Sequence, residues 1–356
     1  MMNQKQLTEA AIELLKELIS IQSFSSEEDK TADAIENWLK RFEIPFQRKI
    51  NNVFAVNKHF DESKPTLLLN SHHDTVKPNS AYTKDPFNPH IEDGKLFGLG
   101  SNDAGGALVS LLATFTHFYG EENLNHNILM VASMEEESSG ENSLRGLLPS
   151  LPKIDVAIVG EPTLMDLAIA EKGLVVFDAQ IKGTPSHAAH PNDNSAIYNT
   201  IEVLEWFKKY KFEKVSDALG EVKLTVTQIN GGSQHNVVPA QVDLVIDVRV
   251  NDKYTNAEIA EILKKESPCG LQERGLKLNS SAIAQDHPLV QSGIALGRKT
   301  YGSPTLSDQA ALACQSLKLG PGDSTRSHSA DEFIYVHEIE EGIDLYIRML
   351  DGFLKK

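Results

Sequence analysis

The sequence predicts a three-layer α/β domain with a smaller α+β domain inserted into it. In the first half of the chain, short apolar runs bounded by turn residues alternate with amphipathic helical segments, which is typical of a sheet covered by helices. After residue 173 the order changes to strand, helix, strand, strand and helix, and helix-and-loop character returns at about residue 286. We therefore expect one domain from 1–173 and 286–356, and an inserted domain from 174–285.

The expected larger domain begins with two amphipathic helices within about residues 1–42. Strand-like segments follow at about 52–57, 66–70, 127–132 and 155–160, and the apolar runs of the last three are typical of buried parallel strands. Apolar side chains at helical spacing predict further helices at 104–118 and 339–354.

The strands of the expected inserted domain should have one solvent-exposed face, because apolar and polar residues alternate along them. Its predicted strands lie at 174–181, 221–229 and 237–250. Its predicted helices lie at 195–210 and 257–265.

Composition excludes several classes of partner. The 356 residues include 34 Lys and Arg against 50 Asp and Glu, a formal charge of −16, which argues against binding to nucleic acid or an anionic membrane. The two cysteines form no CxxC pair, which favours a reducing cytosol over a disulfide framework. The N-terminus lacks the features of a secretion signal, and no apolar run approaches the length of a membrane span. We expect a cytoplasmic protein that acts on a small molecule.

Three of the predicted strands are followed directly by side chains that can bind a metal. These are His72 and Asp74, the glutamates at 135–137, and Glu161. Because ligands bind at the carboxyl ends of the strands in open α/β sheets, these groups are expected to meet at one edge. The sequence therefore predicts a metal site there.

Each group also has an ordinary explanation. A His-x-Asp triplet after a strand is often incidental, and Asp103 in its glycine-rich segment could simply cap a helix. Three consecutive glutamates could form a solvated loop, and His328 could be a solvated loop histidine that precedes a helix capped around Ser329. Their joint placement at one sheet edge favours the metal site.

Five motifs, in order along nearly the whole chain, support a family resemblance. They are His72-x-Asp74, Gly100-x-x-Asp103-x-x-Gly106, the Glu-Glu pair, Gly160-Glu161-Pro162 and the late His328. Together they resemble the acetylornithine deacetylase, succinyl-diaminopimelate desuccinylase, aminoacylase and glutamate carboxypeptidase family of two-zinc amidohydrolases. The resemblance implies a zinc-peptidase-like catalytic domain with an inserted lid or dimerisation domain.

The resemblance also implies the metal ligands. One zinc would be held by His72, Asp103 and Glu161, and the other by Asp103, Glu136 and His328. Cobalt or manganese could substitute for zinc. In the family Asp103 lies beside a cis peptide.

Two further roles follow from the resemblance. Asp74 would orient His72, and Glu135 would be the general base. Because the acidic run is three residues long, the Glu-Glu pair could also begin one residue later. We place it at Glu135-Glu136 because residues 137–140 then match the small polar turn of relatives.

The inserted domain carries two more family motifs. By likeness, His187 in Gly183-x-x-x-His187 would polarise the substrate carbonyl, from the same chain or a partner subunit. Asn236 and Arg249, in the motifs Asn-Val-Val-Pro and Asp-x-Arg, would bind substrate, although a strand-end salt bridge is the alternative for Arg249. The domain would also form a homodimer.

These roles together describe metal-dependent hydrolysis of the amide bond of an N-acyl-L-amino acid. The chain looks most similar to acetylornithine deacetylases, so N-acetyl-L-ornithine, N-acetyl-citrulline or N-succinyl-ornithine in arginine biosynthesis is the expected substrate. A succinyl-diaminopimelate desuccinylase and a dipeptidase remain alternatives, as does a non-catalytic amino-acid-binding protein on the same scaffold.

Overall fold

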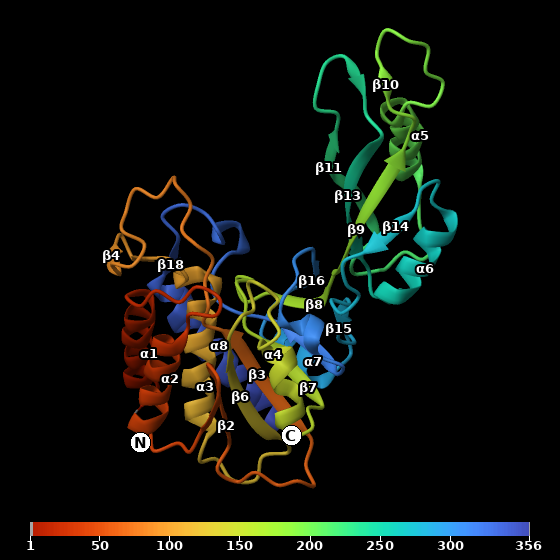
Figure 1. Ribbon diagram of the computed structural model, residues 1–356. Coiled ribbons are helices and arrows are strands. Elements are labelled where there is room, and N and C mark those ends of the chain that lie inside the picture. The colour runs from red at the N-terminus through yellow and green to blue at the C-terminus, as the bar shows by residue number, and fades with distance from the viewer. Residues whose placement is uncertain (1–2, 356) are drawn as a thin grey trace. The chain divides into compact units, whose positions relative to one another are not determined.

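The computed structural model describes residues 3–355 and divides into two compact units (Figure 1). The first unit is formed by the chain up to Ile169, by Ala282–Tyr301 and by the chain from Ser307 onward. The second is formed by Ala170–Ser281 with the short segment Gly302–Leu306. Each unit has its own hydrophobic core.

Within the described part of the chain, six α-helices belong to the first unit. They are α1 (Gln4–Ile19), α2 (Asp29–Arg41), α3 (Gly106–Phe118), α4 (Leu144–Leu147), α7 (Pro288–Ala295) and α8 (Val336–Leu354). The start of α1 is fixed by a capping box, in which the Asn3 side chain accepts from the Gln6 N–H and the Gln6 side chain accepts from the Asn3 N–H. Among residues 3–355, no helix combines the length and apolar character needed to cross a membrane.

A nine-stranded sheet organises the first unit. Its strands run in the order β1 (Gln47–Lys49), β2 (Asn52–Val56), β6 (Asn127–Ser133), β3 (Thr66–His72), β7 (Val156–Val159), β17 (Gln315–Lys318), β8 (Leu167–Glu171) and β15 (Ser281–Ala282), with β16 (Thr300–Ser303) beside β8. The central strands β6, β3, β7 and β17 are mutually parallel, so their carboxyl ends reach the same edge. The strands predicted at 66–70, 127–132 and 155–160 are thus confirmed as buried and parallel, whereas β2 pairs antiparallel with β6.

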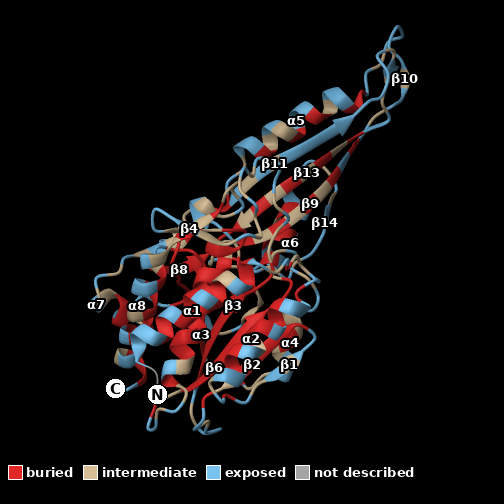
Figure 2. Ribbon diagram, turned by 90° about the vertical axis from the view of Figure 1, so that its left-hand side faces the viewer, coloured by how far each residue is buried: buried red, intermediate tan, exposed pale blue. Residues whose placement is uncertain are grey.

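Helical segments cover both faces of this sheet, which gives the predicted three layers. Successive side chains of β3 point to opposite faces of the sheet. Leu67 and Leu69 pack into the core formed with α1, α2, α3 and α8. Leu68 packs on the opposite face, with Leu144 and Leu147 of α4. Figure 2 shows the buried strands and the buried faces of these helices in red. A sheet fixed on both faces is a rigid support for groups at its edge.

Short irregular elements occur in the loops of the first unit. A π-helical turn, Ser101–Gly105, precedes α3, and 3-10 turns lie at Leu148–Ser150, Asp308–Ala311 and Ser324–Arg326. A small sheet is formed by β4 (His90–Glu92), β5 (Lys95–Phe97) and β18 (Phe333–Tyr335). The expected helix cap around Ser329 is wrong, because β18 intervenes and α8 begins only at Val336.

The second unit is built on a four-stranded antiparallel sheet. Its order is β11 (Lys223–Gly231), β13 (Gln241–Val250), β9 (Gly173–Lys182) and β14 (Leu271–Glu273). Helices α5 (Ala196–Lys209) and α6 (Asn256–Glu266) pack against it, and β10 (Ser186–His187) pairs with β12 (Val237–Val238). In β13 and β9 buried residues alternate with half-buried or exposed ones, as the alternating sequence pattern predicts.

Candidate metal centre

The parallel strands of the first unit deliver three acidic or imidazole groups to one edge of the sheet. His72 is the last residue of β3, Glu137 follows β6, and Glu161 follows β7. Two loops add Asp103, from the π-helical turn, and His328, which follows the last 3-10 turn.

His72, Asp103 and Glu161 form one half of the cluster. The His72 Nε2 lies 3.4 Å from Asp103 Oδ1 and 3.8 Å from Glu161 Oε1. The His72 ring is almost completely buried, and both carboxylates are nearly so. All three groups therefore point one ligand atom each at a common region.

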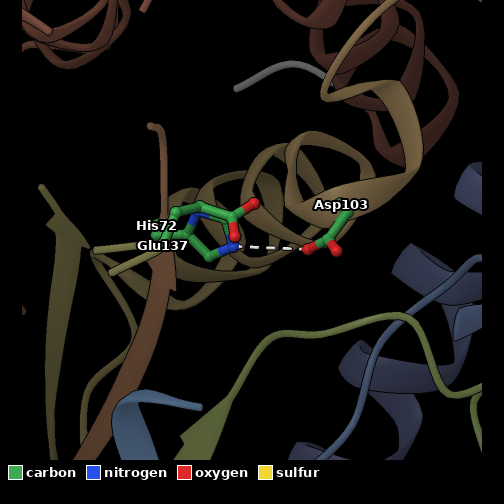
Figure 3. Close-up of side chains that lie close together, drawn as sticks. All are labelled: His72, Asp103 and Glu137. Carbon is green, nitrogen blue, oxygen red and sulfur yellow. Dashed lines mark ion pairs between the residues drawn. The ribbon is translucent and has the colours of Figure 1, made fainter. Parts of the chain in front are cut away.

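Glu137 and His328 form the other half of the cluster, and His328 faces the second carboxylate oxygen of Asp103. One ligand atom each from His72, Asp103 and Glu137 lie within 4.8 Å of one another (Figure 3). The His328 Nε2 lies 3.1 Å from Glu137 Oε2 and 3.6 Å from Asp103 Oδ2. The hydrogen bond to Glu137 raises the pKa of His328 to about 9, with a further contribution from Asp103. Asp103 thus faces both halves and is placed to bridge them.

Asp74 fixes several of these groups at once. The His72 Nδ1 lies 2.9 Å from the Asp74 backbone oxygen and 3.4 Å from its carboxylate, so Nδ1–H donates here and Nε2 faces Asp103. The Asp74 carboxylate also accepts from the backbone N–H of Glu136 at 3.0 Å and of Glu137 at 3.1 Å. Asp74 therefore orients both the imidazole and the acidic turn.

The Glu135 carboxylate is hydrogen-bonded to residues outside the cluster. Its backbone is left-handed, with a φ of 55°, and its carboxylate accepts from the Ser26 Oγ at 2.8 Å and from the Asn142 N–H at 2.9 Å. Glu136 is the residue expected from the sequence to share a cation with Asp103 and His328. In the structure the carboxylate of Glu137 is hydrogen-bonded to His328 and lies with the ligand atoms of His72 and Asp103.

Glu136 lies beside the cluster without belonging to the three-residue ligand group. Burial raises its pKa well above the ordinary value, the charge of His72 opposes this, and the charges of Glu161, Asp308 and Glu137 add to it. A carboxyl group in such surroundings is suited to holding and releasing a proton.

The donor set fits a pair of divalent cations. Burial raises the pKa of Glu161 to about 8, and repulsion from Asp103 contributes. Carboxylates crowded in this way are stabilised in the charged form by a nearby cation. Two imidazoles with several carboxylates form a typical ligand set for catalytic zinc and related metals.

The sequence did not reveal two buried carboxylates next to this site. Asp308 accepts from the Ser133 Oγ at 2.6 Å, and burial raises its pKa to about 6. Glu332 accepts from three backbone N–H groups of the segment that carries Asp103. Backbone donors leave no signal in a sequence, so nothing in the pattern pointed to Glu332.

The second unit brings together two of its three predicted site residues. His187 of β10 is paired with Val237 of β12, and the Ala188 N–H donates to the backbone oxygen of Asn236 at 3.0 Å. The His187 Nδ1 accepts from the Ala189 N–H at 3.1 Å, so in the neutral ring Nε2 carries the proton.

Arg249 lies elsewhere in the second unit. It faces Leu174 at the start of β9, whereas His187 follows the other end of that strand. Its guanidinium forms two hydrogen bonds with Asp247, at 2.9 and 3.1 Å. The salt bridge that was the alternative for Arg249 is therefore present.

A protein-family model named peptidase family M20/M25/M40 matches residues 68–352. The chain belongs to this family. Among curated relatives, it is 24% identical to a succinyl-diaminopimelate desuccinylase of Rickettsia bellii, over 94% of this chain and 95% of the relative. It is 26% identical to a LysW-lysine/LysW-ornithine hydrolase of Sulfurisphaera tokodaii, over 98% and 97%.

Solved structures of the same family share this fold. The aminopeptidase PepT of Bacillus cereus matches with a TM-score of 0.75 and 17% identity over 98% of each chain. A dinuclear metal-binding M20 peptidase of Bacillus subtilis matches with a TM-score of 0.74 and 14% identity, again over 98% of each chain. The predicted fold class and family resemblance are confirmed, and the protein is a metal-dependent hydrolase of this family.

Proposed function

We propose that the protein hydrolyses the amide bond of an N-acylated diamino acid at a centre of two divalent cations. The observation that carries the proposal is the position of Asp103 between two sets of ligands. Its Oδ1 lies 3.4 Å from the His72 Nε2 and its Oδ2 lies 3.6 Å from the His328 Nε2, with Glu161 near His72 and Glu137 hydrogen-bonded to His328. Zinc is the expected metal, with cobalt or manganese as substitutes.

The proposed ligand sets follow from these contacts. One cation would be held by His72, Asp103 and Glu161, and the other by Asp103, Glu137 and His328. When bound, such a pair polarises the scissile carbonyl and makes a water molecule a nucleophile near neutral pH. The alternative register of the acidic run, one residue later than expected from the sequence, is thus the proposed one.

Glu136 is the proposed general base. Its carboxylate would take a proton from the attacking water and deliver it to the nitrogen of the leaving amine. This assignment is supported by its place beside His72 and Glu161 and by the separate engagement of Glu135 with Ser26 and Asn142. Glu135 would instead brace the acidic turn.

His187 is the proposed donor to the oxygen of the scissile carbonyl. Its Nε2 carries the proton in the neutral ring, and the side chain is exposed at β10. A donor that strengthens its bond as charge develops on that oxygen stabilises the transition state. Asn236, which is tied to the same loop, would bind substrate beside it.

The spacing within the second unit favours a site completed by two chains. From Gln241 to Arg249, β13 advances by eight residue steps, or roughly 27 Å at the rise of an antiparallel strand. An acylated amino acid is far shorter than this distance. If Arg249 and His187 both contact one substrate, two subunits must supply them.

The second unit offers a surface for such a dimer. The edge strand β11 is mostly exposed, and α5 exposes the apolar side chains of Ile197, Tyr198 and Ile201. Exposed edge strands pair readily with a second copy. Ile201→Asp should convert the dimer to monomer in sedimentation experiments, whereas Val215→Asp, at an exposed apolar residue outside α5 and β11, should not.

Substrate choice is tested by release of free amine from a panel of amides. The curated relatives are named for hydrolysis of succinyl-diaminopimelate and of LysW-linked lysine or ornithine, which are all conjugates of diamino acids. The panel contains N-acetyl-L-ornithine, the substrate expected from the sequence, with N-acetyl-citrulline, N-succinyl-ornithine, N-succinyl-diaminopimelate and dipeptides.

The zinc- or cobalt-loaded protein should release amine from a diamino-acid conjugate, and the chelated protein should not. Release from dipeptides alone would refute the proposed substrate class. If the protein binds two metals but releases no amine from any compound of the panel, the result would favour an amino-acid-binding protein.

A further inference from the structure

Glu332 has a buried carboxylate that accepts hydrogen bonds from three backbone N–H groups. Its side chain belongs to a residue that is only 2% exposed. Oε1 accepts from the N–H of Asn102 at 2.8 Å and of Asp103 at 2.9 Å, and Oε2 accepts from the N–H of Gly100 at 3.1 Å. The Glu332 backbone oxygen also accepts from the Gly98 N–H, at 3.0 Å.

The segment that carries these N–H groups is not a regular helix or strand, so it does not supply backbone acceptors for them. Gly100 is left-handed, with a φ of 74°, and Asp103 has non-helical angles, φ −118° and ψ 98°, inside the π-helical turn. The N–H groups of Gly100, Asn102 and Asp103 therefore donate to the Glu332 carboxylate instead of to the backbone carbonyl groups of a regular helix. Buried N–H groups need an acceptor, and Glu332 provides it.

The same contacts join the segments of two proposed metal ligands. Glu332 follows His328 by four residues in the chain. Asn102, next to Asp103, adds a second link, since its side chain donates to the Asp323 backbone oxygen at 3.1 Å and accepts from the Asp323 N–H at 3.0 Å. The loop 323–332 and the turn that presents Asp103 are therefore fixed to each other.

We propose that Glu332 is a positioning residue that sets the placement of Asp103 relative to His328 and thereby the affinity of the site for its second cation. The inference rests on the proposed two-cation function. Glu332 acts through the backbone of Asp103 and is not itself a ligand. A support of this kind tunes a metal site by holding a ligand in place.

Glutamate has a specific advantage at this position. Two carboxylate oxygens can accept from all three N–H groups. The amide of Glu332→Gln has one oxygen and one NH2 group, so a donor would face either the Gly100 N–H or the pair from Asn102 and Asp103. The isosteric variant therefore tests the hydrogen bonds without changing side-chain volume.

The experiment is a cobalt(II) titration of the metal-free protein, followed by visible absorption and calorimetry. In Glu332→Gln the weaker of the two binding events should lose roughly 10–100-fold in affinity, and the cobalt absorption bands should shift. The matched control is Asp155→Asn, which removes a carboxylate acceptor of the Thr66 N–H at the opposite end of β3. The control should bind cobalt like the wild type.

Unchanged affinity and absorption in a folded Glu332→Gln would overturn the inference and leave the proposed function intact. A wild type that binds no cobalt would instead refute the proposed function. If Glu332→Gln does not fold, Glu332→Asp is titrated in its place, because it keeps the charge but cannot reach all three donors. Failure of both variants to fold would make Glu332 a structural residue and would also overturn the inference.

Discussion

Exchanging Glu136 and Glu135 for glutamine, one at a time, separates the two registers of the acidic run. Removing a general base costs roughly 10²–10⁴-fold in turnover, or about 3–5 kcal/mol of transition-state stabilisation at about 1.36 kcal/mol per tenfold. We expect Glu136→Gln to lose this much, with two metals still bound, because Glu137 supplies the ligand next to Asp103 and His328.

Glu135→Gln should behave differently. The Glu135 carboxylate accepts from the Ser26 hydroxyl and from two donors of Asn142, so the variant should lose about 1–3 kcal/mol of unfolding free energy. Turnover of the folded fraction should fall far less than in Glu136→Gln. The assay is kcat with elemental analysis of metal and chemical denaturation of both variants.

The opposite pattern would refute this reasoning. If Glu135→Gln abolishes turnover with two metals bound while Glu136→Gln loses a metal, the register first expected from the sequence is the true one. Loss of metal from both variants would show that the acidic turn acts as one unit.

Three further variants probe other parts of the account. His328→Ala should bind one metal instead of two by elemental analysis, since it removes a ligand from only one side of Asp103; retention of two metals would contradict its role. His187→Ala should lower kcat roughly 10²–10³-fold with metal content unchanged, as expected for loss of an oxyanion donor, and an unchanged rate would remove it from the mechanism. Burial lowers the pKa of His73 to about 4, so the folded metal-free protein keeps this ring neutral. The contribution of the neutral ring to the free energy of unfolding is complete above pH 6.5. It is lost as the pH falls toward 4, and the loss amounts to up to about 3 kcal/mol. In urea denaturation at a series of pH values, the unfolding free energy of His73→Gln should fall less between pH 6.5 and 4 than that of the wild type. An equal fall in the two proteins would refute the prediction.

The strands that carry the site were the most predictable part of the fold. The apolar runs that precede His72, Glu137 and Glu161 are uninterrupted, and the structure forms buried parallel strands from them. β17, Gln315–Lys318, was missed because it is short and begins with two polar residues. The small sheet of β4, β5 and β18 was missed because strands of three residues show no periodicity.

The acidic run shows where the sequence could not decide. Residues 135–137 are chemically identical, so only the backbone determines which carboxylate faces Asp103. In the structure Glu135 has a left-handed backbone, and the Asp74 carboxylate accepts from the N–H groups of Glu136 and Glu137. Neither feature can be deduced from residue type, because each depends on the packing of a separate segment.

The central claim is that two cations share Asp103, and a crystal structure of the zinc-loaded protein with anomalous diffraction tests it most directly. We predict two anomalous peaks, one contacted by His72, Asp103 and Glu161, and the other by Asp103, Glu137 and His328. A single peak, or a second peak bound by Glu136 with Glu137 turned away, would contradict the account.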